Sequence, residues 1–321
     1  MSSVIVPADT DPETKPEQAT AGDDADKEPQ NALTQKFTEK EWAALKEFRV
    51  RPTRVSLNSR FVPCPLTAAV LFQPLLPDVL EKAYEGKEDA RTTPIVLWGV
   101  TLDPSGKKDA RASVVLMKWL RARNLNVSEA MALMVDTLRW REEFNIESVM
   151  AETYPDVFDG FGHLYGRDKE GRPIMYNIYG RNNDLTTAFS DVQRFIRWRI
   201  ALMEKGITLV DFETVDQIVQ VHDYEGVGLG SRTTNSKAAA SALSTIFQNH
   251  YPEFLAKKFF VNVPSIMTWI FWLFKPVLPP ATLAKMKVVG HGPSAIGKEL
   301  LPLIDVKELP THYGGVVEDA W

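Results

Sequence analysis

The stretch Ile218–Gly230, with the sequence IVQVHDYEGVGLG, places the tightest constraint on what this chain can fold into. Its β-branched residues followed by glycines indicate a strand that ends in a turn. Side chains alternate across a strand, so Gln220, His222 and Tyr224 share one face, while two valines and Asp223 share the other. An imidazole and a phenol two residues apart therefore point into the same space.

Two further stretches, Ile174–Gly180 and Lys257–Pro264, repeat this alternation of an apolar and a mixed face. We interpret the three mixed faces as the wall of an internal pocket for a large, mostly apolar ligand with a few polar anchor points. The mixed faces are formed by Met175, Asn177 and Tyr179 in the first stretch and by Lys258, Phe260 and Asn262 in the second.

Arg199 is the unusual residue of an otherwise amphipathic helix predicted over Val192–Lys205 and capped by Ser190 and Asp191. Its neighbours three and four positions away are all apolar. An arginine in such a stripe either extends its guanidinium to the edge of the apolar surface or pairs with a buried anion. The sequence pattern by itself favours the first alternative and leaves the second open.

The chain alternates strands with helices in its second half, which predicts an α/β domain with a largely parallel sheet. We expect three parts: a disordered acidic tail over 1–30, a small helical N-terminal lobe with an irregular proline-rich segment over 31–148, and a ligand-binding domain over 149–321. The apolar run Phe259–Phe274 is interrupted by a proline and too short to span a bilayer. We therefore expect a soluble protein that visits membrane surfaces only transiently.

Several function classes are disfavoured by composition and motifs. The net charge of −5 gives no basic surface for nucleic acid, and the single cysteine, Cys64, permits no internal disulfide and fits a reducing compartment. The first residues are polar and acidic and do not form a secretory signal. The sequence has no G-x-x-x-x-G-K-[ST] phosphate loop or G-x-S-x-G elbow, and its five histidines lack metal-ligand spacing. The sequence thus predicts a binding protein and not an enzyme.

Several strings, taken together and in order, resemble the CRAL-TRIO family of Sec-fourteen-like lipid-transfer proteins over roughly 110–315. Three of them resemble more closely its fungal non-classical branch, the haem-binding phosphatidylinositol transfer proteins. The family-level strings are KWLRAR at 118–123 with Trp140-Arg141, the apolar helix after FVNVP at 260–264, and Tyr313-Gly314-Gly315; the branch-level strings are FIRWRIALMEKG at 195–206, QVHDYEGV at 220–227 and KFFVNVP at 258–264.

The resemblance implies phosphatidylinositol transfer combined with binding of haem b, in a hydrophobic pocket closed by a helical gate at Trp269–Phe274 and the helix after Pro280. It assigns Tyr224 as the axial ligand of the haem iron, and it places His222, Tyr179, Arg199 and Lys258 around the haem. A ferric ion favours a phenolate ligand, and cationic side chains suit haem propionates. It also implies a link between phosphoinositide homeostasis and a haem or oxidant-stress response.

The lipid headgroup site of the wider family is matched only in part. Arg123 occupies the position of one basic residue of that site, and His312 the position of another near the terminal glycine pair, whereas Asn124 replaces the family's next basic residue. Arg123 also stands where the branch's best-known member has a second tyrosine near the haem. A second tyrosine contact is therefore not expected here.

Other interpretations of the same residues remain open. Tyr224 and His222 could be a hydrogen-bonded pair in an ordinary core. The protein could be a haem-dependent redox enzyme or sensor, or a phospholipid carrier without haem. For the favoured interpretation, the resemblance implies a cytoplasmic protein with peripheral association to the endoplasmic reticulum or microsomes, and to the plasma membrane.

Overall fold

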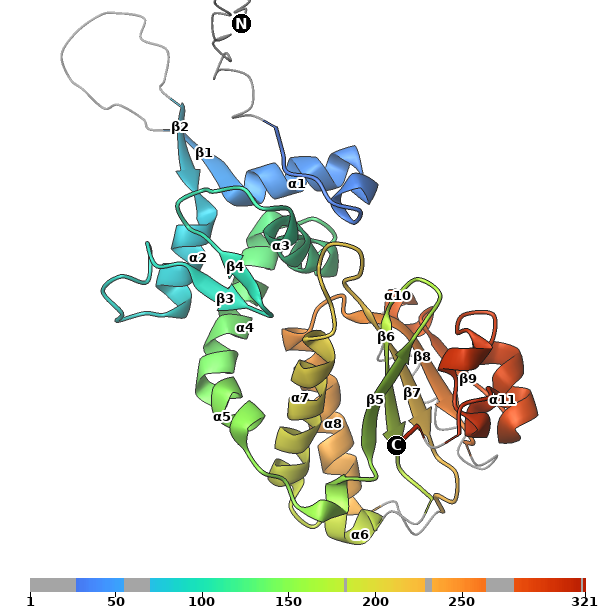
Figure 1. Cartoon of the computed structure of the whole chain (residues 1–321). Helices are drawn as coiled ribbons and strands as arrows, with labels where there is room; N and C mark the ends of the chain where they lie inside the picture. The colour runs from blue at the N-terminus through green and yellow to red at the C-terminus, as the bar shows by residue number, and fades with distance from the viewer. Residues whose placement is uncertain (1–26, 55–69, 182–183, 229–232, 264–279, 319) are drawn as a thin grey trace, which may run out of the picture.

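The computed structural model describes residues 27–54, 70–181, 184–228, 233–263, 280–318 and 320–321 (Figure 1). The predicted gate at Trp269–Phe274 lies outside these residues. The predicted tail over 1–30 overlaps them only at 27–30, where Glu28 forms ion pairs with Arg49 and Lys108.

A five-stranded mixed sheet forms the centre of the C-terminal half, with its strands in the order in which they occur along the chain. The first pair is an antiparallel hairpin, and every later pair is parallel. This confirms the predicted α/β class with a largely parallel sheet. The strands are β5 (Gly162–Arg167), β6 (Pro173–Ile178), β7 (Ile218–Asp223), β8 (Leu255–Val261) and β9 (Met286–Val288).

Helices cover both faces of this sheet. The two long helices α7 (Val192–Ile207) and α8 (Thr234–His250) lie on one side, and α11 (Gly292–Leu300) lies on the other (Figure 1). Two buried cores follow this division: Met175 and Ile218 belong to the core with α7, and Ile174, Val219 and their neighbours belong to the core with α11. Short segments complete the domain: η2 (Asp156–Phe158), α6 (Leu185–Ala188), α10 (Pro280–Leu283), η4 (Val306–Glu308) and η5 (Thr311–Tyr313).

The N-terminal lobe is built mainly of helices, as predicted. Its β-pairs are short, and one of them joins the two ends of the proline-rich segment, residues 50–54 and 70–74. The elements are η1 (Thr34–Lys36), α1 (Glu39–Arg49), β1 (Val50–Arg54), β2 (Val70–Pro74), α2 (Leu75–Ala83), β3 (Ile95–Leu97), β4 (Val100–Leu102), α3 (Ala110–Ala122), α4 (Val127–Phe144) and α5 (Ile146–Ala151).

Local sequence signals explain where these helices begin. Thr38 and Glu41 form a capping box, in which the Thr38 amide donates to Glu41 Oε2 at 2.8 Å and the Glu41 amide donates to Thr38 Oγ1 at 3.3 Å. The carboxylates of Asp109 and Asp191 accept from backbone amides in the first turns of α3 and α7. Asn126 caps α4 in the same way.

The lobe is anchored to the sheet domain by buried ionic contacts. Lys118 of α3, with 1% of its surface exposed, donates to Asp216 Oδ2 at 3.0 Å and to the Glu253 carbonyl at 3.1 Å. Arg141 of α4 makes a two-pronged contact with Glu204 of α7, at 2.6 and 3.1 Å. The main hydrophobic core runs through both parts. The boundary predicted at 148/149 falls within α5. Because residues on both sides of this boundary belong to the same hydrophobic core, the lobe and the sheet domain share one packed interior.

The Tyr313-Gly314-Gly315 sequence packs against α11, and its glycines are required sterically. Gly314 has φ +91°, and a Cβ there would lie 2.7 Å from Gly297 Cα. A Cβ on Gly315 would lie 1.8 Å from the Leu309 carbonyl oxygen. A side chain at Gly314 would push the segment away from α11, and one at Gly315 would push it away from Leu309.

Asp223, fully buried at the end of β7, connects the carboxyl ends of three strands. Its carboxylate lies 2.7 Å from Arg181 Nη2, accepts from Tyr313 Oη at 3.0 Å and accepts from Asn262 Nδ2 at 2.9 Å. Asn262 Oδ1 in turn accepts from the Gly292 amide at the start of α11. Asp223 thus fixes β6, β7, β8 and α11 relative to one another.

We expect Asp223→Ala to lower the free energy of unfolding by about 3–5 kcal/mol, because it leaves the buried Tyr313 hydroxyl and the partly buried Arg181 guanidinium without their shared partner. Urea unfolding measures this loss. The control is Glu225→Ala, which removes the other carboxylate on Arg181, 2.8 Å away in an exposed pair. Its cost is expected to stay below about 1 kcal/mol. Equal losses in the two variants would contradict a central role for Asp223.

Candidate functional site

The structure brings together the five residues that the sequence assigned to one pocket wall. Two of them, His222 on β7 and Lys258 on β8, lie on adjacent strands of the sheet, where Gln220 is the register partner of Lys258 and His222 is the partner of both Asn177 and Phe260. Tyr179 and Tyr224 follow β6 and β7 directly. Arg199 approaches from α7, which covers this face.

A chain of polar contacts runs across the wall. Tyr179 Oη lies 3.4 Å from His222 Nδ1, and His222 Nε2 lies 3.2 Å from Gln220 Oε1. The Gln220 oxygen can only accept, which favours the tautomer with the proton on Nε2. His222 Nδ1 is then free to accept a hydrogen bond from the Tyr179 phenol.

Tyr224 belongs to the same aromatic cluster. Its ring centroid lies 5.2 Å from that of Tyr179 and 6.4 Å from that of Phe260. Burial raises the pKa of Tyr224, with a further contribution from Tyr179. Its phenol is therefore protonated in the ligand-free protein, and the phenolate requires a strong positive charge beside the oxygen.

Arg199 does not extend to the surface, since only 2% of it is exposed. Its guanidinium lies 5.1 Å from the ring centroid of Phe247 on α8, and its Nη1 has no hydrogen-bond partner among the described residues. Burial lowers the pKa of Arg199, an effect that Tyr179 opposes. Of the two alternatives left open by sequence, the structure contradicts the extended side chain.

Lys258 contributes a second cation-forming group to this wall. Its Nζ lies 5.2 Å from the ring centroid of Phe260, and the side chain is half-buried. Burial and then the neighbouring Arg199 lower the pKa of Lys258 to about 7. Burial likewise holds the pKa of His222 well below its usual value, reinforced by Lys258 and Arg199.

Asn177 was on the mixed face predicted from sequence but was not among the predicted site residues. It is 1% exposed, and neither its amide nitrogen nor its amide oxygen has a hydrogen-bond partner among the described residues. Buried polar atoms without hydrogen-bond partners are uncommon, and here they indicate that the Asn177 amide needs a partner from outside the described residues. Strand alternation gives the direction of Asn177, but only the packed structure reveals that its amide is unpaired.

Arg123 and His312, the two predicted headgroup residues, are not joined to this wall by any contact among the described residues. Arg123 ends α3 half-buried, and its guanidinium donates to the adjacent Ala122 carbonyl at 2.9 Å. His312 is exposed in η5, beside α11. Their part in a headgroup site stays a prediction.

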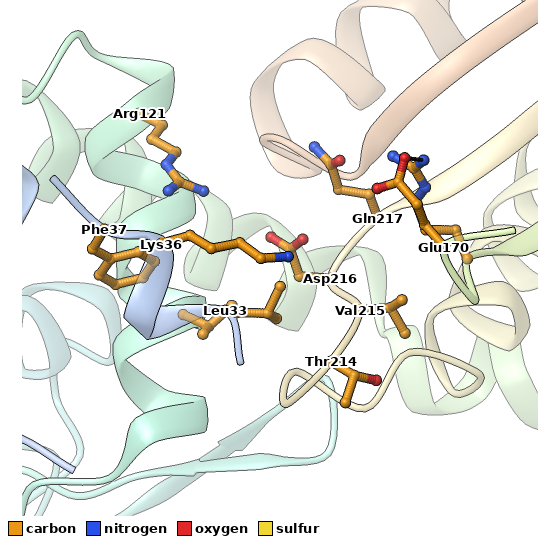
Figure 2. A pocket seen from close by; sticks show the side chains of 11 residues that line it. Leu33, Lys36, Phe37, Arg121, Glu170, Thr214, Val215, Asp216 and Gln217 are labelled. Carbon is orange, nitrogen blue, oxygen red and sulfur yellow. Dashed lines mark ion pairs between the residues drawn. The ribbon is translucent and has the colours of Figure 1, made fainter. Parts of the chain in front are cut away.

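A separate cleft of about 380 Å³ lies between the lobe and the sheet domain, near the amino ends of β6 and β7 (Figure 2). Figure 2 shows the Lys36 side chain pointing toward Asp216. Other charges of the cleft are already paired: Arg121 with Glu41 and Asp216 with Lys118. None of the predicted site residues lines it. The cleft is therefore part of the contact between the lobe and the domain.

The wall combines aromatic rings, two cation-forming side chains and unpaired polar atoms. Within the described residues, no group of three or more histidine, cysteine or acidic side chains is placed to hold a metal ion by itself. Among the described residues, no helix is long and apolar enough to cross a bilayer. Fold and wall together define an α/β binding domain suited to a largely apolar ligand with negative charge.

Comparison with known proteins gives the family. Residues 158–315 match the CRAL/TRIO domain, and the chain belongs to the CRAL-TRIO family. It is 38% identical to Patellin-5 of Arabidopsis thaliana over 250 residues, which are 75% of this chain and 36% of that protein. It is 33% identical over 260 residues to the phosphatidylinositol transfer protein sfh5 of Sclerotinia sclerotiorum, covering 76% of this chain and 60% of that protein.

A solved structure supports the same placement. The crystal structure of Sfh5 aligns with a TM-score of 0.64 and 28% sequence identity, over 77% of this chain and 88% of that one. The resemblance to the Sec-fourteen-like family and its fungal branch is confirmed. The chain spans less than two thirds of the length of the two curated relatives described above.

We expect Lys258→Met to stabilise the ligand-free protein, by more than about 1 kcal/mol at pH 7, because each unit of pKa depression corresponds to about 1.4 kcal/mol. The folded-state pKa of Lys258 is about 7, below the unfolded value of about 10.4. The unfolded chain therefore binds more protons between these pH values, and wild-type stability rises with pH across that window. The advantage of the variant is thus largest below pH 7 and disappears toward pH 10.

Chemical unfolding at a series of pH values measures this advantage. Lys257→Met serves as the matched control, because Lys257 is exposed on the opposite side of the same strand. An advantage of Lys258→Met that does not change between pH 7 and pH 10 would show that desolvation of the amine is not its cause.

Proposed function

We propose that this protein carries phosphatidylinositol and also binds haem b in the pocket behind the mixed sheet face. The single observation that carries the proposal is the buried guanidinium of Arg199, whose unpaired Nη1 lies in a wall where no described carboxylate contacts it. A buried cation without an anionic partner is costly, and an anionic group of a ligand would lower that cost. The relatives named phosphatidylinositol transfer proteins support the lipid part of the proposal.

The residues present fit a haem. The Tyr224 phenol would supply the iron ligand, and Arg199 and Lys258 would neutralise the propionates. The rings of Tyr179 and Phe260, which flank Tyr224, would contact the porphyrin plane. A bound ferric haem supplies the positive charge that the Tyr224 phenol needs in order to lose its proton.

His222 is suited to a supporting position. It is neutral because burial and two neighbouring cation-forming side chains disfavour the imidazolium. It is held between Tyr179 and Gln220, so its ring orientation is fixed before any ligand arrives. Residues that surround a metal ligand and have a fixed orientation hold that ligand in place and adjust how strongly it binds the metal.

The carrier role includes transient contact with membrane surfaces. We propose a cytoplasmic protein that associates peripherally with the endoplasmic reticulum, microsomes or the plasma membrane. Binding of haem in the lipid pocket would link phosphoinositide homeostasis to a haem or oxidant-stress response. We favour binding over catalysis, because the wall places no carboxylate acid–base group beside Tyr224 among the described residues.

The Tyr224→Phe variant tests haem binding. Purified wild-type protein reconstituted with ferric haem is expected to show a Soret absorption band, which the variant loses or shifts because it lacks the ligand oxygen. Tyr176→Phe is the matched control, since Tyr176 is buried on the opposite face of the same sheet and stacks on Tyr313. A colourless wild type after expression with ample haem would rule out the haem part of the proposal.

Radiolabelled phosphatidylinositol transfer between vesicles tests the lipid part. Arg123→Ala and His312→Ala are each expected to slow transfer about tenfold or more, since a hydrogen bond to a charged group contributes about 1.5–3 kcal/mol and about 1.4 kcal/mol corresponds to a factor of ten. Both variants should keep the Soret band. Wild-type transfer no faster than vesicles alone would contradict the carrier role, and unchanged transfer in both variants would remove these two residues from the headgroup site.

A further inference from the structure

Lys258 differs from the other buried or partly buried lysines in what surrounds its amine. Lys118 is paired with Asp216 at 3.0 Å, and Lys285 is paired with Glu253 at 2.9 Å. No described carboxylate lies within ion-pairing distance of Lys258; its amine lies over the Phe260 ring, and the nearest charge that acts on it is the Arg199 cation.

These surroundings favour the uncharged amine. Loss of hydration and a neighbouring positive charge both oppose the ammonium form, and they bring the pKa of Lys258 to about 7. A substantial fraction of the amine is then neutral at physiological pH. A neutral lysine in an apolar pocket beside another cation is the arrangement that makes lysine a nucleophile toward carbonyl groups.

We propose that Lys258 captures long-chain apolar aldehydes as a reversible imine within the pocket. The inference rests on the pocket of the proposed function but requires neither haem nor phosphatidylinositol. It assigns a covalent ligand site to a lysine that would otherwise serve only as a positive charge.

The chemistry balances without an oxidant, a reductant or a second substrate. The Nζ lone pair attacks the carbonyl carbon, and the proton of the attacking nitrogen moves to the former carbonyl oxygen to give a carbinolamine. Loss of that hydroxyl together with the remaining proton of the nitrogen, as water, forms the C=N bond, and addition of water reverses every step. The Tyr179–His222–Gln220 chain on the same wall offers hydrogen-bonding groups to the oxygen.

The shape of the wall defines the class of aldehyde. Lys258 is the cross-strand neighbour of Gln220 and its amine lies over the Phe260 ring, on a face that also carries Tyr224 and contacts the core of α7 and α8. An alkyl chain can lie against these rings, whereas a short polar aldehyde gains nothing from them. We therefore expect hexadecanal to react and glyceraldehyde not to be selected.

The test uses the full-length protein, hexadecanal and sodium cyanoborohydride at pH 7, with intact-mass analysis and peptide mapping. Reduction fixes the imine as a stable secondary amine. We expect a single adduct on Lys258, at least about tenfold above that on Lys257, because an ordinary exposed amine with a pKa of about 10.4 is almost fully protonated at this pH. Lys257 is the internal comparison, since it precedes Lys258 but is exposed.

Two variants distinguish the site from general reactivity. Lys258→Arg keeps a long basic side chain and removes the nucleophilic amine, so it should abolish the adduct, whereas Lys257→Arg should leave it unchanged. Thermal unfolding of both checks that they fold. An adduct on Lys258 no greater than on Lys257, or one that persists at the same level in Lys258→Arg, would overturn the proposal.

The same preparations are assayed for the Soret band and for phosphatidylinositol transfer. An adduct on Lys258 in a protein that binds no haem supports the aldehyde site and removes the haem proposal. A protein that binds haem but gives no preferential adduct on Lys258 supports the haem proposal and removes the aldehyde site. Failure of one proposal is therefore distinguishable from failure of the other.

Discussion

The buried carboxylate of Asp223 is the contact on which the arrangement of the pocket depends. It holds the ends of β6, β7 and β8 and, through Asn262, the start of α11. Asp223 and His222 are adjacent in sequence, so they lie on opposite faces of β7. Because Asp223 must face α11 to reach Tyr313, His222 is forced to face α7. A one-residue change of register would exchange the two faces.

The two faces therefore serve different purposes. The α11 face pairs its buried carboxylate internally, since Asp223 contacts Arg181, Tyr313 and Asn262, and it leaves the Tyr176 hydroxyl without a described partner. The α7 face leaves an arginine nitrogen and an asparagine amide without described partners and keeps a lysine among aromatic rings. An unpaired arginine nitrogen and an unpaired asparagine amide on one face of a sheet, opposite a face whose buried carboxylate is paired, are what a site leaves when its last partner is a ligand.

The period-2 pattern was sufficient to predict the sheet class and the side of the sheet on which His222, Tyr224, Tyr179 and Lys258 lie. It could not predict Asp223 as a junction, because Tyr313 lies ninety residues further along the chain and only the folded sheet brings it near. Helical spacing placed Arg199 in an apolar stripe but could not tell exposure from burial, which depends on α8 packing across it. The pairing of residues 50–54 with 70–74 joins segments that the prolines made look irregular.

The unpaired groups also connect ligand binding with stability. In the ligand-free protein, burial works against the charged forms of both Arg199 and Lys258, as the lowered pKa of each shows. A ligand that places negative charge beside them removes this penalty in the folded state alone, so it stabilises the fold in proportion to its occupancy. A ligand that instead reacts with the neutral amine is helped by the same cost of burying a charge, because that cost keeps the Lys258 amine unprotonated. Under the two proposals, desolvation of this one lysine would serve two kinds of cargo, an anion that restores its charge and an aldehyde that reacts with its free electron pair.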